Sequence, residues 1–143
     1  MHTVKFNKVH DNARLPLKAH ATDAGSDIYA VEQTQILPWA VKQVATGLKV
    51  AYIPSGHKIE VYGRSGFSKK GYLIANAPGQ VDETFRGELG ILVYNSTSSL
   101  LTIEVGDRIA QISLEAVIPV EYEFSDETTE TARGEGGFGS TGR

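Results

Sequence analysis

The apolar stretches of this chain are short, rich in β-branched residues and separated by turn-forming residues. Within residues 58–62, polar and apolar side chains alternate with a period of two, which is typical of a half-buried strand. No segment keeps a helical apolar period for three turns, and only residues 65–71 suit a short helix. These features predict an all-β sandwich or barrel. The expected turns include 46–47, 78–79 and 95–99, and the expected strands are Val4 with Phe6, 28–31, 36–37, 41–45, 48–53, 58–62, 72–75, 89–94, 100–105 and 109–120.

Length, charge and cysteine content exclude several classes of protein. A chain of 143 residues suits a single core. Its net charge of −3 gives no global attraction for nucleic acid or an anionic membrane, so we expect neither as a direct partner. The absence of cysteine excludes disulfides, thiolate zinc sites and a cysteine nucleophile. Without a signal-like start or an apolar stretch near ~20 residues, we expect a cytoplasmic protein, in the host cytoplasm if the source is viral.

The carboxyl-terminal segment differs in composition from the rest. Residues 121–130 carry five acidic residues and no basic one, and residues 133–143 hold five of the fifteen glycines. Such a segment buries little when alone, so we divide the chain into a β domain over 1–124 and a mobile arm over 125–143. Composition favours a disordered tail. The order of its glycines, hydroxyls, arginines and single phenylalanine suits a phosphate and a flat ring, so an arm that closes over a ligand is the sharper hypothesis.

Five polar, glycine-containing islands lie beside the apolar segments. Each has a structural interpretation: Asp27 could cap a turn, Arg64 could precede a helix, Asp82 could close a hairpin, and Asp107 with Arg108 could form a surface ion pair. Their joint occurrence in one small chain is less easily explained by structure alone. The islands are 24–27, 63–66, 76–82 continued by 85–88, 106–111, and the tail from Arg133.

This series of islands resembles the five motifs of the homotrimeric dUTPases, which hydrolyse dUTP to dUMP and pyrophosphate. The motifs read Ala-Gly-Ser-Asp at 24–27, Arg-Ser-Gly at 64–66, Gly-x-Val-Asp-x-x-Phe-Arg-Gly-Glu at 79–88, Gly-Asp-Arg-Ile-Ala-Gln at 106–111 and Arg-Gly-x-Gly-Gly-Phe-Gly-Ser-Thr-Gly at 133–142. The resemblance implies a distorted jelly-roll, β-clip-like barrel that assembles as a homotrimer. It also implies active sites shared between subunits, closed by a flexible arm, in an enzyme that keeps uracil out of DNA and supplies dUMP for dTMP synthesis.

The resemblance also assigns the catalytic and phosphate-binding groups. Asp82 would be the general base that activates the water attacking the α-phosphorus, a role that suits a carboxylate. Asp27 would support the cofactor Mg²⁺ through water, since this ion usually keeps several waters. The groups expected to bind the phosphates are Arg64, Ser65, Gly66 and Gln111 and, from the arm, Arg133, Gly139, Ser140 and Thr141.

Recognition of the nucleoside is assigned by the same resemblance. Phe138 would stack on uracil, and Phe85 would pack on the deoxyribose where most family members carry tyrosine. Because the ring is retained, we expect discrimination against UTP to survive the loss of the phenolic hydroxyl. The uracil pocket is expected to consist of Asn76, Gly79, Gln80, Val81 and Gly90.

Two alternatives to a dUTP hydrolase remain open. The related dCTP deaminases share the fold and often carry phenylalanine at the position of Phe85, but the strand after the hairpin offers no glutamate base between Leu89 and Val93. A binding protein that uses the nucleotide-bound trimer as a signal is the second alternative. Nucleotide turnover by the purified chain separates that alternative from the hydrolase.

Overall fold

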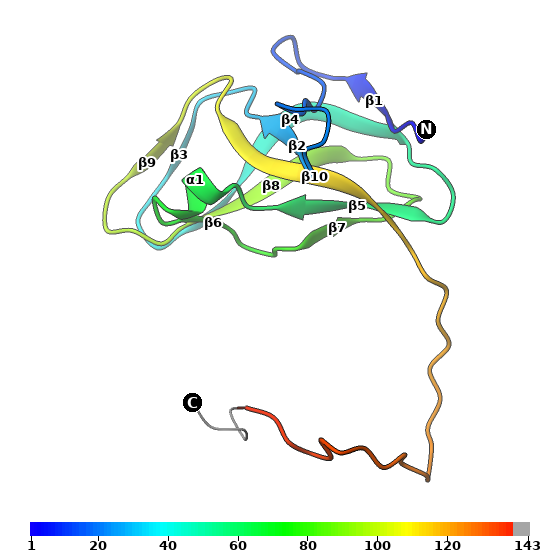
Figure 1. Ribbon diagram of the computed structural model, residues 1–143. Helices are drawn as coiled ribbons and strands as arrows, with labels where there is room; N and C mark the ends of the chain where they lie inside the picture. Colours follow the sequence, from blue (N-terminus) through cyan, green and yellow to red (C-terminus); the bar gives the residue numbers. More distant parts are fainter. Residues whose placement is uncertain (139–143) are drawn as a thin grey trace.

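A computed structural model describes residues 1–138 and shows a nearly all-β protein, as predicted (Figure 1). Two four-stranded sheets, ordered β1-β4-β8-β6 and β2-β10-β5-β7, and a small β3-β9 pair make up the barrel-like body. The pairings within all three sheets are antiparallel. The elements are β1 (Lys5–Lys8), β2 (Ser26–Tyr29), β3 (Thr34–Ile36), β4 (Val41–Tyr52), β5 (His57–Tyr62), α1 (Ser65–Ser68), β6 (Tyr72–Ile74), β7 (Gly79–Val81), β8 (Glu88–Asn95), β9 (Leu101–Ile103) and β10 (Arg108–Ala116).

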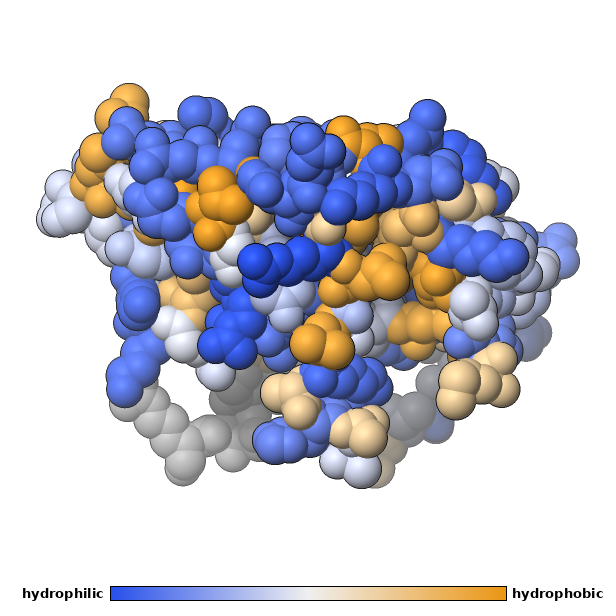
Figure 2. Space-filling model, turned by 90° about the horizontal axis from the view of Figure 1, so that it is seen from above, coloured by the Kyte–Doolittle hydropathy of each residue, from blue (hydrophilic) through white to orange (hydrophobic). Residues whose placement is uncertain are grey.

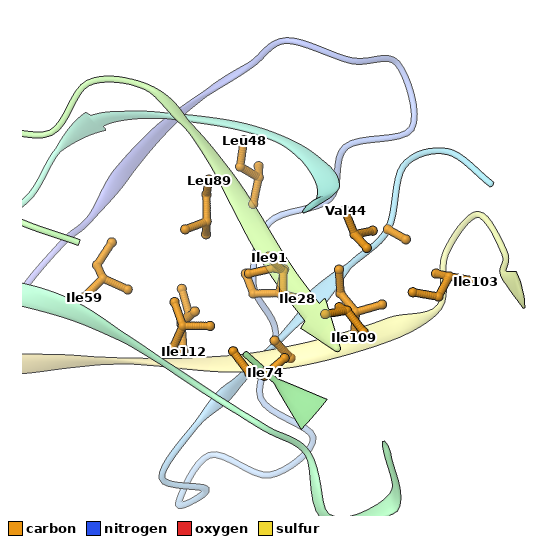
Figure 3. Packing of buried hydrophobic residues seen from close by; sticks show 14 of the residues in the cluster. Ile28, Val44, Leu48, Ile59, Ile74, Leu89, Ile91, Ile103, Ile109 and Ile112 are labelled. Atoms are coloured by element: carbon orange, nitrogen blue, oxygen red, sulfur yellow. The ribbon is translucent and has the colours of Figure 1, made fainter. Parts of the chain in front are cut away.

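The core lies between the sheets and consists of aliphatic side chains (Figure 3). Along β8, alternate residues point inward, so that Leu89, Ile91 and Val93 are buried. Ile28 of β2 and Ile109 of β10 are fully buried in the same cluster. Each such side chain contributes about 1.5–3 kcal/mol through removal from water, which makes this cluster the main source of stability. The period-two alternation of short segments therefore produces the sandwich.

Three of the expected boundaries are wrong. The turn expected at 46–47 lies inside one long strand, β4, where Gly47 has φ +65° and the pairing with β8 shifts register between Ala45 and Lys49. A bulge thus replaces the turn, because the partner strand continues across it. Gly79, expected in a turn, begins the strand β7, which pairs with β5. The last strand ends at Ala116 instead of continuing to residue 120.

The short helix and the arm complete the chain. Helix α1 begins at Ser65, within the segment expected to be helical. After Ala116 the chain leaves the barrel, and residues 117–138 contain neither helix nor strand (Figure 1). Within residues 1–138, no helix has the length and apolar character needed to cross a membrane.

Candidate functional site

A cavity of about 290 Å³ lies between β7, β8 and the turn that follows β7. Most of its lining comes from the hairpin that joins β7 to β8. The lining residues are 79–82, Phe85 and 88–92, together with Gln43, Val61, Ile74 and Asn76. The structure thus gathers seven of the residues expected to form the nucleoside pocket and catalytic centre. They are Asn76, Gly79, Gln80, Val81, Asp82, Phe85 and Gly90.

Strand β7 lines this cavity, and Gly79 has no side chain that would fill the space beside the Asn76 amide. A Cβ at Gly79 would lie 3.2 Å from the Val61 Cβ and 3.4 Å from the Asn76 Nδ2, so the amide covers the strand where a side chain would otherwise stand. Among residues 1–138, strand β7 pairs only with β5, in a register that places Val61 opposite Gly79. Its other edge therefore offers main-chain donors and acceptors to a ligand.

Asp82 and Phe85 belong to one tight turn at the mouth of the cavity. The Phe85 amide donates to the Asp82 carbonyl at 3.0 Å. The Phe85 ring lies over Gly87, where a Cβ would approach its Cζ to 2.5 Å, so the missing side chain at Gly87 admits the ring. Phe85 is 41% exposed, and the Asp82 carboxylate is also exposed within this single chain. A base and an apolar ring thus face the same space.

A second cluster centres on the buried carboxylate of Asp27, on β2. Asp27 is only 5% exposed, and its Oδ1 accepts from the Arg64 Nε at 2.7 Å and from the Gln111 Nε2 at 3.2 Å. Its Oδ2 accepts from Arg108 at 3.4 Å. The antiparallel pairing of β2 with β10 places Gln111 opposite Asp27. Asp27, expected to support the metal, therefore contacts both Arg64 and Gln111, which are expected to bind phosphate.

A second cavity, of about 450 Å³, lies next to this cluster and has three basic side chains in its lining. Arg64, Lys70 and Arg108 line it together with one acidic residue, Asp107, and Gly66 at the start of α1. Ser65 is the first residue of α1, and its carbonyl accepts from the Lys69 amide at 2.9 Å. The excess of positive charge suits a polyanion such as a chain of phosphates.

The two cavities share no lining residue among residues 1–138. The residues expected to bind the nucleoside and Asp82 therefore lie at the first cavity, whereas Arg64 and Gly66, expected to bind phosphate, line the second. Arg133 and Phe138 lie in the arm, where the Arg133 Nε donates to the Gly136 carbonyl at 2.8 Å and Phe138 is fully exposed. The expected phosphate ligands Gly139, Ser140 and Thr141 lie outside the described residues.

Two contributors were missed by sequence reasoning. Gln43 lines the first cavity, although its position inside an expected strand gives no indication of a binding role. Arg108 stands within one of the polar islands, yet only the structure shows that it contacts Asp27.

A family model of dUTPase matches residues 11–142 of the chain. The chain belongs to the dUTPase family. A curated relative from Clostridium novyi, named deoxyuridine 5'-triphosphate nucleotidohydrolase, is 39% identical over 94% of this chain and 95% of its own. A second with that name, from Picosynechococcus, is 36% identical over 97% of this chain and 98% of its own.

Solved dUTPases share the fold described above. The dUTPase of Staphylococcus bacteriophage 80alpha, solved with dUPNHPP, superposes with a TM-score of 0.88 at 28% identity and covers 100% of both chains. A mutant dUTPase from phage phi11 of S. aureus, described with a structural Mg(II) ion, gives a TM-score of 0.80 at 25% identity. It covers 90% of this chain and 99% of its own. The jelly-roll-like fold expected for the dUTPase family is thus confirmed.

Proposed function

We propose that this dUTPase-family chain hydrolyses dUTP at the α-phosphorus to dUMP and pyrophosphate. The observation that carries the proposal is the meeting of Asp82, Phe85, Asn76 and the free edge of β7 in one cavity. A base that can accept a proton lies there beside groups suited to a flat, hydrogen-bonding ring. Family membership and the names of the full-length relatives support the same reaction.

In this proposal, uracil binds between the Asn76 amide and the main chain of β7. A pocket that pairs with specific polar edges of a base rejects other bases strongly, because a mismatched base leaves buried polar groups unpaired. Phe85 packs on the deoxyribose and leaves no room for a 2′-hydroxyl. From the arm, Phe138 stacks on the base, a contact worth roughly 1–3 kcal/mol in other base–aromatic pairs.

The chemical step is an in-line displacement by water. Asp82 accepts a proton from the water while the water oxygen forms a bond to the α-phosphorus. The bond between that phosphorus and the oxygen bridging to the β-phosphorus breaks, and pyrophosphate leaves with the electron pair. No group of the protein forms a covalent bond, so Ser65 binds phosphate and does not act as a nucleophile.

The phosphates bind among the basic residues around Asp27. Arg64 and Gln111, held in place by the Asp27 carboxylate, direct their remaining donors to the phosphate oxygens, together with Ser65 and the amide of Gly66. Arg133, Gly139, Ser140 and Thr141 of the arm bind the terminal phosphates. Because the two cavities are separate in one chain, a complete site needs residues from more than one copy, which supports the proposed homotrimer.

The surface of the single chain agrees with such an assembly. Hydrophobic residues interrupt an otherwise mainly hydrophilic face of the molecule (Figure 2). Leu15 and Leu17 before β2, and Ile118 and Val120 after β10, each expose more than half of their surface. Apolar surface of this kind is often covered by a protein partner, and here we assign it to further copies of the chain.

The Asp27 cluster fits Mg²⁺ only through a water molecule that would bridge the ion and the Asp27 carboxylate. Within residues 1–138, no three acidic or histidine side chains come together to hold a metal ion. A carboxylate accepts about four hydrogen bonds, and three are already made to Asp27, which leaves its Oδ2 one acceptor position for a metal-bound water. Substrate phosphates would provide the other ligands, as is usual for this ion. When bound, Mg²⁺ would neutralise charge on the departing pyrophosphate.

Pyrophosphate release by the purified protein with Mg²⁺ tests the proposal. We expect rapid release from dUTP and little from dTTP, dCTP or UTP. Ammonia release from dCTP would show a deaminase instead of a hydrolase. No pyrophosphate release from any of the four nucleotides would contradict the proposed catalysis and favour the regulatory binding protein.

A hydrolase acting on the nucleotide pool would keep uracil out of DNA and supply dUMP. The cytoplasmic location belongs to the same proposal.

A further inference from the structure

Gln43 lines the nucleoside cavity from a strand that belongs to none of the polar islands. It lies on β4, opposite Leu92 of β8, and it is exposed. The next pair on the same face of these strands joins Ala45 to Gly90, so Gln43 and Gly90 are diagonal neighbours. Long side chains reach across such a diagonal.

The Gln43 carboxamide covers the α-carbon of Gly90. A Cβ built at Gly90 would lie 2.2 Å from the Gln43 Nε2, 2.6 Å from its Cδ and 2.8 Å from its Cγ. The amide therefore occupies the volume that any other residue at position 90 would fill. Gly90 and Gln43 are thus a matched pair: the missing side chain of one makes room for the amide of the other.

Gln43 also keeps its hydrogen-bonding capacity available. The comparable amide of Gln33 donates to Glu104 at 3.0 and 3.1 Å, whereas no side-chain hydrogen bond ties the Gln43 amide to another of the described residues. A carboxamide offers two N–H donors and a carbonyl acceptor. In the cavity it adds donors and an acceptor beside Gly90 and the apolar side chains of Leu92 and Phe85.

We propose that Gln43 is a further substrate-binding residue, whose amide hydrogen-bonds the pyrimidine ring in the cavity over Gly90. This inference rests on the proposed nucleotide substrate. The ring is the chosen partner because its edge carries donors and acceptors in one plane, as the amide does. A neutral hydrogen bond of this kind changes affinity by roughly 2–10-fold, which makes Gln43 a contributor to recognition and not to the chemical step.

Gln43→Leu tests the inference, since it removes the amide and keeps the approximate size. We expect KM for dUTP to rise about 2–10-fold with kcat unchanged within about twofold. The dissociation constant of dUMP, measured by calorimetry, should rise by the same factor. The inhibition constant of pyrophosphate, which lacks the base, should stay the same. Gln33→Leu makes the same change outside the cavity and should alter none of these values.

A second pair of variants tests the contact between Gln43 and Gly90. Gly90→Ala would displace the amide, so it should raise the dissociation constant of dUMP. Adding Gln43→Leu to Gly90→Ala should then have little further effect. Independent, multiplying effects would overturn the assigned contact, and an unchanged dUMP affinity in Gln43→Leu would overturn the binding role.

The outcomes also separate this inference from the function on which it depends. Wild-type protein that hydrolyses dUTP, together with a Gln43→Leu variant of unchanged KM, overturns only the role of Gln43. Wild-type protein that neither hydrolyses dUTP nor binds dUMP overturns both proposals. Circular dichroism and the elution volume of each variant establish that fold and assembly are retained.

Discussion

The Arg64 Nε donates to the Asp27 Oδ1 at 2.7 Å, which joins strand β2 to the residue just before α1. The carboxylate is buried and also accepts from Arg108 and Gln111. Asp27, expected to support a metal, therefore holds the side chains that we propose bind phosphate.

Asp27→Asn should weaken both stability and activity. The change removes the negative charge that two arginines share, and hydrogen bonds to charged groups are worth about 1.5–3 kcal/mol. Because both arginines are partly exposed, we expect a loss of about 1–3 kcal/mol, visible as a lower thermal midpoint, and slower pyrophosphate release. Asp11→Asn, at an exposed position, is the control. Equal midpoints for the two variants would contradict the anchoring role.

Asp82→Asn should abolish turnover and retain binding. The amide keeps the shape of the side chain but accepts no proton, and general-base catalysis typically contributes about 10²–10⁴-fold. We expect kcat to fall by at least about 100-fold, with the dissociation constant of dUMP nearly unchanged. Glu83→Gln alters the neighbouring carboxylate, which accepts from the Gly56 amide, and should be nearly as active as the wild type. Substantial turnover by Asp82→Asn would refute the base assignment.

Phe85→Tyr restores the hydroxyl that most family members carry. One neutral hydrogen bond is worth about 0.5–1.5 kcal/mol, so kcat/KM for dUTP should rise no more than about 10-fold. The preference for dUTP over UTP should stay the same, because the ring fills the space in both proteins. Phe85→Ala removes the ring, and it should lose that preference. Steady-state rates with dUTP and UTP measure both effects. A Phe85→Ala variant that still rejects UTP would show that another residue discriminates deoxyribose from ribose.

The strands could be predicted because their chemistry is local. In β5, the alternation of Ile59 and Val61 with polar neighbours determines which face is buried, and the structure agrees. The turn expected at 46–47 failed because partner strands override local preference. Gly47 takes a positive φ, its amide donates to the Glu88 carboxylate at 2.8 Å, and β4 continues beside β8.

In the candidate site, too, some contacts are predictable from local sequence and others depend on the pairing of strands. Sequence motifs identified Asp82, Asn76 and Phe85, which share one cavity because β7 and the following turn are continuous in the chain. The contact of Gln43 with Gly90 depends on the register of β4 against β8, which no local pattern specifies. The position of Arg64 and Gly66, which we propose bind phosphate, at a second cavity likewise follows from the fold.

Tyr62→Phe should raise the pKa of Glu60. The Glu60 carboxylate binds the Lys58 ammonium at 2.5 Å and accepts from the Tyr62 hydroxyl. Lys58 is the larger cause of its lowered pKa, and Tyr62 the second. We therefore expect the pKa of Glu60 to move upward in Tyr62→Phe but to stay below its ordinary value. Carboxyl ¹³C NMR titration measures the change, with Tyr122→Phe, at an exposed position after β10, as the control.

The same variant predicts a change in acid stability. A carboxyl group whose folded pKa is lowered stabilises the protein above its unfolded pKa, near 4.5, and this contribution is lost as pH falls through the folded value. Tyr62→Phe should thus be less stable than the wild type above pH 4.5, and the difference should shrink in more acidic solution. A difference that widens with acidification would contradict this linkage.

Asn95→Asp should destabilise the protein in a pH-dependent manner. Asn95 is fully buried at the end of β8, and its Nδ2 faces the carbonyls of Ile36, Leu37 and Ser99 at 2.8–3.3 Å. Aspartate has the same shape but presents an oxygen to those carbonyls. At neutral pH the ionised group repels them and leaves them without a donor, so we expect a loss of more than about 1–3 kcal/mol.

Protonation would restore one donor at this position. The pKa of the introduced carboxyl group should therefore be raised in the folded state, and the loss of stability should grow as pH rises through and above the ordinary aspartate value of about 3.9. Chemical denaturation at several pH values measures this, with the exposed Asn7→Asp of β1 as the control. A loss of stability that is the same in acid and at neutral pH would show that the Asn95 donor is not what joins the end of β8 to the Ile36 and Ser99 carbonyls.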